Sequence, residues 1–318
     1  MRRRALLPMP LLAAPALAQA PWPGRPIRAV IPYTPGGATD AMARLAAQKL
    51  SERLGVPVVP ENRAGGSGTI GGAAVAGAAP DGTTILLTAS VHVMGRQVLR
   101  SVPYDPVADF TPIARTGQGP LLLVTGPGRP ERDIAAVAEA ARRAPGAWSF
   151  GVSALGAAGH LASIAFNRLA GLDIPMVPYR GSAPALADIA AGNLQLMLDP
   201  ILATLPLARG GQVRALAITR AARSPIAPEI PTAAEAGMPG LEFASWYGAW
   251  GPRGLPAEIV ARMNAALREG MAEPAVVRRL TELGFEPVQE SPAAFAAFIA
   301  AEQARNAALL RAANFQPD

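Results

Sequence analysis

The stretch Ile27-Arg28-Ala29-Val30-Ile31-Pro32-Tyr33-Thr34-Pro35-Gly36-Gly37-Ala38-Thr39-Asp40 combines the features that decide the fold. Its first five residues are mostly apolar and predict a buried strand that ends at Pro32. A glycine-rich turn follows, and Thr39 is expected to cap a helix that runs to Leu54. A strand followed directly by a helix is the building unit of an α/β protein.

The same alternation continues along the chain. Residues 56–59 and 83–88 predict two further strands, with a small-residue helix at 69–78 between them. A second series places strands at 149–152, 175–178, 194–198 and 212–218, and helices at 134–143, 160–169 and 183–191. Helices are also expected at 257–270, 274–283 and 292–313. Because a βαβ order favours parallel strands and right-handed crossovers, the sequence predicts an α/β fold with two such halves.

Two segments are expected to connect the halves. The apolar run 113–124 is interrupted by Gly117, Gly119 and Pro120, which indicates a first crossing, and residues 232–251 carry the chain back. The expected lobes are 21–122 plus 243–318, and 123–242. Two lobes joined by two crossings leave a cleft that can close on a ligand.

Composition excludes several function classes. The 318 residues contain no cysteine and only two histidines, so a cysteine-ligated metal or a multi-histidine metal site is excluded. The formal charge of +6 falls to +3 without Arg2, Arg3 and Arg4. The remaining basic residues are scattered and not interleaved with aromatics, which argues against nucleic-acid binding. We expect no cofactor and a monomer.

The first twenty residues predict a cleavable export signal. Three arginines precede an apolar segment, and Ala18-Gln19-Ala20 is a small-x-small cleavage site. Three prolines make this segment unsuited to a stable membrane span. The sequence therefore predicts a periplasmic protein whose mature chain begins near residue 21.

Two loops between a strand and a helix are candidate anion sites. Gly36 and Gly37 allow close backbone approach, and helix-terminal N–H groups follow them. The alternative is a plain turn in which Asp40 has a structural role. The second loop, Ser153 to Gly159, occupies the equivalent place in the second half.

Two other patterns suggest different functions. Gly66-Ser67-Gly68-Thr69-Ile70-Gly71 matches G-x-G-x-x-G, but no acidic residue lies about 20 positions later, so dinucleotide binding is rejected. Ser153, His160 and Asp199 can be written as a hydrolytic triad, but the Gly-x-Ser-x-Gly spacing and the α/β-hydrolase chain order both fail. An exported hydrolase using Ser153 and His160 stays open as the main rival.

Asp199 and Arg180 each follow a predicted strand. Asp199 could accept a hydrogen bond from a ligand or cap the next helix. Arg180 could pair with a ligand carboxylate or form a structural ion pair.

Several short motifs together resemble the substrate-binding receptors of tripartite tricarboxylate transporters, the Bordetella uptake gene (Bug) family. The matching stretches are Pro35-Gly36-Gly37 with Asp40 and Arg44; Glu61-Asn62-Arg63; Pro80-Asp81-Gly82; Tyr104-Asp105-Pro106; His160-Leu161-Ala162; Val177-Pro178-Tyr179-Arg180-Gly181; Pro231-Thr232 with Glu235-Ala236-Gly237; and Trp246. They run in order from about residue 26 to residue 270.

This resemblance implies a type II periplasmic-binding-protein fold, a Venus flytrap without catalysis, that holds a small organic carboxylate on main-chain N–H groups. The implied ligand-binding residues are Tyr33, Thr34, Gly36, Gly37, Ser67, Gly68, His92, Ser153, Ala154, Gly156, Ala157, Arg180, Gly181 and Asp199. The implied partners are the subunits of a membrane permease or the ectodomain of a sensor kinase. A receptor that serves only signalling is a further alternative.

The second loop departs from the family pattern. Ala157, Ala158 and Gly159 precede His160, where family members commonly carry Ser or Thr. We therefore expect this loop to bind the ligand through its backbone N–H groups and Ser153.

Overall fold

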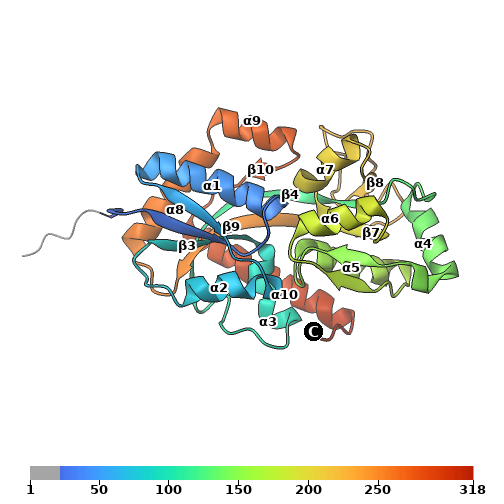
Figure 1. Cartoon of the computed structure of the whole chain (residues 1–318), viewed down its shortest axis with the longest axis horizontal. Coiled ribbons are helices and arrows are strands. Elements are labelled where there is room, and N and C mark those ends of the chain that lie inside the picture. The colour runs from blue at the N-terminus through green and yellow to red at the C-terminus, as the bar shows by residue number, and fades with distance from the viewer. Residues whose placement is uncertain (1–21, 318) are drawn as a thin grey trace, which may run out of the picture.

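The computed structural model describes residues 22–317 and shows strands and helices alternating along the chain (Figure 1). The elements are β1 (Ile27–Ile31), α1 (Ala38–Leu54), β2 (Val58–Asn62), α2 (Thr69–Ala76), β3 (Thr84–Ala89), α3 (Gly95–Val98), β4 (Phe110–Thr125), α4 (Ile134–Arg143), β5 (Phe150–Val152), α5 (Ala158–Ala170), β6 (Met176–Pro178), α6 (Ser182–Ala191), β7 (Leu196–Pro200), α7 (Ile201–Arg209), β8 (Arg214–Ile218), β9 (Ala244–Pro252), α8 (Ala257–Met271), α9 (Pro274–Glu282), β10 (Glu286–Pro287) and α10 (Pro292–Ala312). Short 3₁₀ turns lie at 66–68, 90–94 and 145–147. The predicted α/β class is confirmed.

The elements divide between two ends of the molecule, as Figure 1 shows. The first, called lobe 1, contains the parallel strands β1, β2 and β3, with β9 antiparallel beside β3. The second, called lobe 2, contains the parallel strands β5, β6 and β7 with helices α4 to α7 around them. Parallel strands are joined through crossover helices. The loops that lead from β1 into α1 and from β5 into α5 therefore lie at the carboxyl ends of their strands.

One long strand belongs to both lobes. Residues 110–120 of β4 pair with β9, whereas residues 121–125 pair with β7 and β8. The first crossing that the sequence predicted at 113–124 falls on this strand, and β4 continues through Gly117, Gly119 and Pro120. The two glycines allow close packing, because a Cβ on Gly119 would lie 2.4 Å from the Phe285 ring.

Helix α10 packs along the junction of the lobes. Phe295 on this helix lies against Trp246 and Trp250 of β9, with ring centroids 5.7 and 5.2 Å away. These three side chains are almost fully buried, in a cluster that also contains Val152 and Leu161 of lobe 2. Burying such large rings is a major source of stability, so α10 ties the two lobes together.

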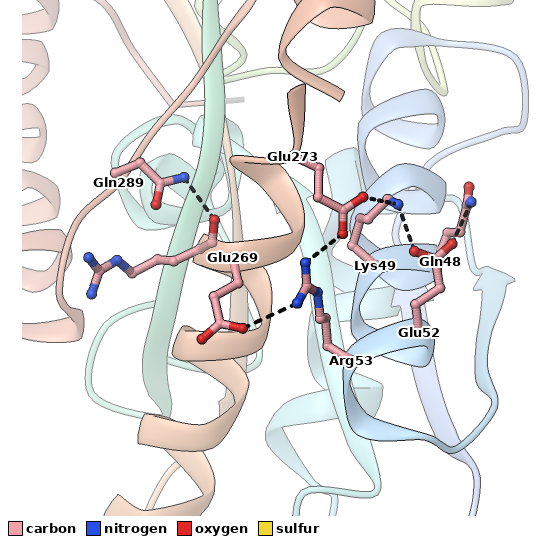
Figure 2. A network of polar contacts seen from close by, with 8 residues as sticks. Gln48, Lys49, Glu52, Arg53, Glu269, Glu273 and Gln289 are labelled. Atoms are coloured by element: carbon pink, nitrogen blue, oxygen red, sulfur yellow. Dashed lines mark hydrogen bonds and ion pairs between the residues drawn. The ribbon is translucent and has the colours of Figure 1, made fainter. Parts of the chain in front are cut away.

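Helix α1 is held against α8, and against Glu273 directly before α9, by an ion-pair network (Figure 2). Lys49, the only lysine in the chain, donates to Glu52 at 2.6 Å and to Glu273 at 2.7 Å. Arg53 pairs with the other oxygen of Glu273 at 2.8 Å. These pairs help to fix the orientation of α1, whose opposite end begins at the glycine-rich loop.

Among residues 22–317, no helix is both long and apolar enough to cross a membrane. The predicted export signal lies outside the described residues.

Candidate ligand-binding site

The first loop connects β1 to α1 and ends at Gly37, the N-cap residue. The sequence assigned the cap to Thr39, which is wrong: the helix already begins at Ala38, and no side chain caps it at Gly37. Instead, the N–H of Gly36 donates to Asp40 Oδ2 at 3.1 Å. Gly36 has φ +89°, which favours glycine because a Cβ is strained there.

Asp40 has the structural role expected for it. Its carboxylate also accepts from Arg44 Nε at 2.9 Å and from Asn62 Nδ2 at 2.9 Å. Burial would raise the pKa of Asp40, but the hydrogen bonds from Arg44, Asn62 and Gly36 hold this pKa below its usual value. Asp40 therefore fixes the first loop as an ionised group.

The second loop, between β5 and α5, repeats this arrangement. Its N-cap is Ala157, and no side chain caps the helix at that residue. Gly156 has φ +81°, and its N–H donates to Nδ1 of His160 at 3.0 Å. The two loops are structural counterparts, as the sequence predicted, although different side chains hold them.

A narrow cavity lies between these two helix starts. It is lined by Tyr33, Thr34, Gly37, Ala38, Thr39, Asp40, Ala89, Ser90, Val91, Ser153, Ala154, Ala157, Ala158, Gly159, Gly181, Ser182, Pro200, Ser245 and Tyr247. Within the described residues, this lining contains no Lys, Arg or His, and most of its polar groups are hydroxyls and backbone amides. The first turn of a helix carries unpaired N–H groups and the positive end of the helix dipole, so the arrangement favours an anion.

The lobes touch each other around this cavity. The N–H and Oγ1 of Thr34 donate to the carbonyl oxygen of Arg180 at 3.2 and 3.0 Å. The N–H of Leu155 donates to Ser67 Oγ at 3.2 Å. These contacts connect residues far apart in sequence, and they describe a closed arrangement of the lobes.

Seven of the fourteen predicted ligand-binding residues line the cavity. They are Tyr33, Thr34, Gly37, Ser153, Ala154, Ala157 and Gly181. Four others support the lining: Gly36 and Gly156 shape the two turns, Ser67 joins the lobes, and Gly68 lies against the hydroxyl end of Tyr33. A Cβ on Gly68 would lie 2.7 Å from the Tyr33 hydroxyl, which itself donates to Ser67 O at 3.2 Å.

His92 is not at the cavity, which corrects the sequence prediction. It is buried in lobe 1 among Tyr104, Phe110 and Trp250, with ring centroids 6.0, 4.4 and 5.1 Å away. Burial lowers the pKa of His92 to about 3, with a smaller opposing effect from a hydrogen bond to Pro106. His92 is therefore a neutral core residue.

Arg180 and Asp199 do not line the cavity. The Arg180 side chain is exposed, and this residue contributes its carbonyl oxygen to the contact between the lobes. Asp199 is fully buried beside Pro200 and does not cap α7, whose N-cap is Pro200. Its carboxylate oxygens have no hydrogen-bond partner among the described residues. Burial raises the pKa of Asp199 to about 7, and the nearby Ser182 side chain lowers this pKa by a smaller amount.

Sequence reasoning missed several lining residues, including Ser182, Ser245 and Tyr247. Ser245 Oγ donates to the Tyr247 hydroxyl at 3.1 Å, and both residues belong to β9. Their spacing of two places them on one face of a strand, which is a signal that was present in the sequence. The sequence does not show that this face of β9 meets the cavity, because that depends on where β9 crosses between the lobes.

The rival motifs have structural explanations. In a hydrolytic triad, the Nδ1–H of the histidine donates to the aspartate. Here Nδ1 of His160 accepts the N–H of Gly156 instead, so it does not donate to Asp199. In the Gly66–Gly71 motif, a Cβ on Gly71 would lie 2.8 Å from Pro32 Cβ. This glycine allows α2 to pack closely against the end of β1.

The fold and the cavity together define a two-lobed solute-binding protein. A family model described as tripartite tricarboxylate transporter family receptor matches residues 42–315, and the chain belongs to this family. The chain is 37% identical to Protein BugT of Bordetella pertussis, over 94% of this chain and 92% of that protein.

Solved structures agree with this assignment. A Rhodopseudomonas palustris protein solved with adipate superposes with a TM-score of 0.90 at 40% identity, over 93% of this chain and all of the other. MatC of R. palustris with bound malate gives a TM-score of 0.87 at 33% identity, over 91% of this chain and all of the other. The predicted periplasmic-binding-protein fold is confirmed, and the structural neighbours are solute-binding proteins.

Proposed function

We propose that this protein is a periplasmic receptor that captures a small organic dicarboxylate between its lobes. The observation that carries the proposal is the cavity between the first turns of α1 and α5, which lacks basic side chains among the described residues. The two helix starts together offer N–H donors to a carboxylate of such a ligand. The adipate and malate complexes of related proteins support this ligand class.

Capture works by a shift in population. A ligand that touches both lobes stabilises the closed form relative to the open form. The cross-lobe hydrogen bonds of Thr34 and Ser67 add to this preference. The closed form then presents a combined surface to a permease of the tripartite type, or to a sensor-kinase ectodomain.

We also propose that the lobes are residues 21–122 plus 243–318, and 123–242. The change in pairing along β4 near residue 120 supports the first boundary. The start of β9 at Ala244 supports the second.

The ligand class is tested by mass spectrometry of small molecules that copurify with the protein, followed by thermal melts with a panel of organic acids. Panel members are C4 to C6 dicarboxylates with and without hydroxyl groups, aromatic acids, and the matching diamides as uncharged controls. A ligand at 100 times its Kd adds about 2.7 kcal/mol to the free energy of unfolding. An unchanged melt with every acid contradicts the proposal, and so does turnover of generic esters that is lost in Ser153→Ala.

A further inference from the structure

The two helices that face the cavity begin in the same way but carry different charges. In each helix, the third residue reaches back to accept the N–H of the glycine before the N-cap. In α1 this residue is Asp40, at 3.1 Å from Gly36, and in α5 it is His160, at 3.0 Å from Gly156. The geometry is similar to a capping box, in which a third-position Glu or Gln accepts a backbone N–H.

His160 performs this task as a neutral group. Its side chain is almost fully buried, and burial lowers the pKa of His160 to about 4, so the imidazole is uncharged at neutral pH. Since Nδ1 accepts from Gly156, the proton of the neutral ring lies on Nε2. Asp40, by contrast, places a negative charge at the start of α1, and Arg44 pairs with it.

The surroundings of the second loop fix it in two ways. The ring of Phe315, which follows α10, lies edge-to-face against His160 with centroids 5.3 Å apart. The loop also packs against lobe 1, because a Cβ on Gly156 would lie 2.9 Å from Met94 Cβ and from a methyl of Val98. The Gly156 turn is thus held by the His160 ring and by lobe 1, directly before the cavity-lining Ala157 and Ala158.

We infer that His160 is the positioning residue of the second loop: by accepting the Gly156 N–H through Nδ1, it holds the start of α5 in place without adding a negative charge beside a bound carboxylate. The inference rests on the proposed function and extends it to a residue that does not itself line the cavity. A carboxylate side chain in place of His160 would hold the same N–H but would repel a bound anion. An apolar side chain would leave the buried N–H of Gly156 without an acceptor.

Three variants separate these effects. His160→Gln keeps an acceptor and stays neutral, His160→Glu keeps an acceptor and adds a charge, and His160→Leu removes the acceptor. We expect affinity for the best-binding dicarboxylate, measured by titration calorimetry, to stay within about threefold in His160→Gln. Affinity should fall at least tenfold in both other variants.

Amide hydrogen exchange of Gly156 without ligand provides the structural readout. We expect slow exchange in the unaltered protein, His160→Gln and His160→Glu, and fast exchange in His160→Leu. Nitrogen NMR of His160 should show the Nε2–H tautomer. Because Gln and Glu are nearly isosteric, a difference in affinity between these two variants reports charge even if His160→Leu fails to fold.

The outcomes distinguish the inference from the function. If the unaltered protein binds a dicarboxylate and His160→Leu binds it equally well, or His160→Glu matches His160→Gln, the inference is overturned and the function stands. If the unaltered protein binds no acid of the panel, the proposed function fails and the inference fails with it.

Discussion

The N–H of Leu155 in lobe 2 donates to the hydroxyl oxygen of Ser67 in lobe 1 at 3.2 Å. Ser67 has φ +50°, a left-handed conformation that is unfavourable for a residue with a Cβ. A strained residue that supplies the acceptor for a contact between the lobes indicates that this contact matters in the closed form.

Ser67→Ala should therefore weaken ligand affinity by about fivefold, since a hydrogen bond present in the closed form contributes about 1 kcal/mol. Titration calorimetry with the best-binding dicarboxylate measures the effect. Ser101→Ala, at an exposed serine, is the matched control and should bind normally. Equal affinities for the two variants would exclude Ser67 from closure.

Gly37→Val should weaken binding at least tenfold by hindering closure. Gly37 has φ −87°, so valine causes no left-handed strain, and its Cβ would lie 3.5 Å from Ser182 of lobe 2. The additional methyl groups of valine then have too little space between the lobes. Small-angle scattering should show that ligand no longer compacts this variant.

Gly146→Val is the control for that experiment, because a Cβ on Gly146 meets no atom within 4 Å. Gly146→Val should bind ligand and compact as the unaltered protein does. Normal binding by Gly37→Val would remove the first loop from the site.

His92→Phe should leave ligand affinity unchanged and reduce the sensitivity of the fold to acid. The pKa of His92 is about 3 in the folded protein, against about 6.5 in an unfolded chain. The unfolded chain therefore binds more protons between these values, and stability falls as the pH drops from about 6.5 to about 3. Phenylalanine removes this contribution. Between pH 7 and pH 4.5, the free energy of unfolding, measured by chemical denaturation, should therefore fall less in His92→Phe than in the unaltered protein. A drop in affinity at pH 7 would restore His92 to the site.

Asp199→Asn should stabilise the protein at pH 8 by several degrees and much less at pH 5. Burial raises the pKa of Asp199 to about 7, so the folded protein binds its proton more tightly than an unfolded chain does. Stability from this group is complete at low pH and is lost as the pH rises from about 4 to about 7. Thermal melts at both pH values measure the difference, with Asp173→Asn at an exposed carboxylate as control. An equal shift at pH 5 and pH 8 contradicts this account of Asp199.

Local patterns gave most of the secondary structure. The helix expected at 257–270 is α8 (Ala257–Met271), because the apolar stripe of Ile259, Val260, Met263 and Leu267 records a buried helical face. The first crossing expected at 113–124 falls within β4. Gly117, Gly119 and Pro120 stay in one strand because pairing with β9 outweighs the weak strand preference of glycine and proline.

The sequence by itself determined the α/β alternation and the two loops that follow β1 and β5, because turn chemistry and apolar periodicity act over a few neighbouring residues. Only the tertiary structure decided that Ser182, Ser245 and Tyr247 line the cavity, that His92 lies in the core, and that Ser67 meets Leu155. These relationships join segments that are distant along the chain. Their geometry depends on how the crossings β4 and β9 orient the lobes, which no local pattern records.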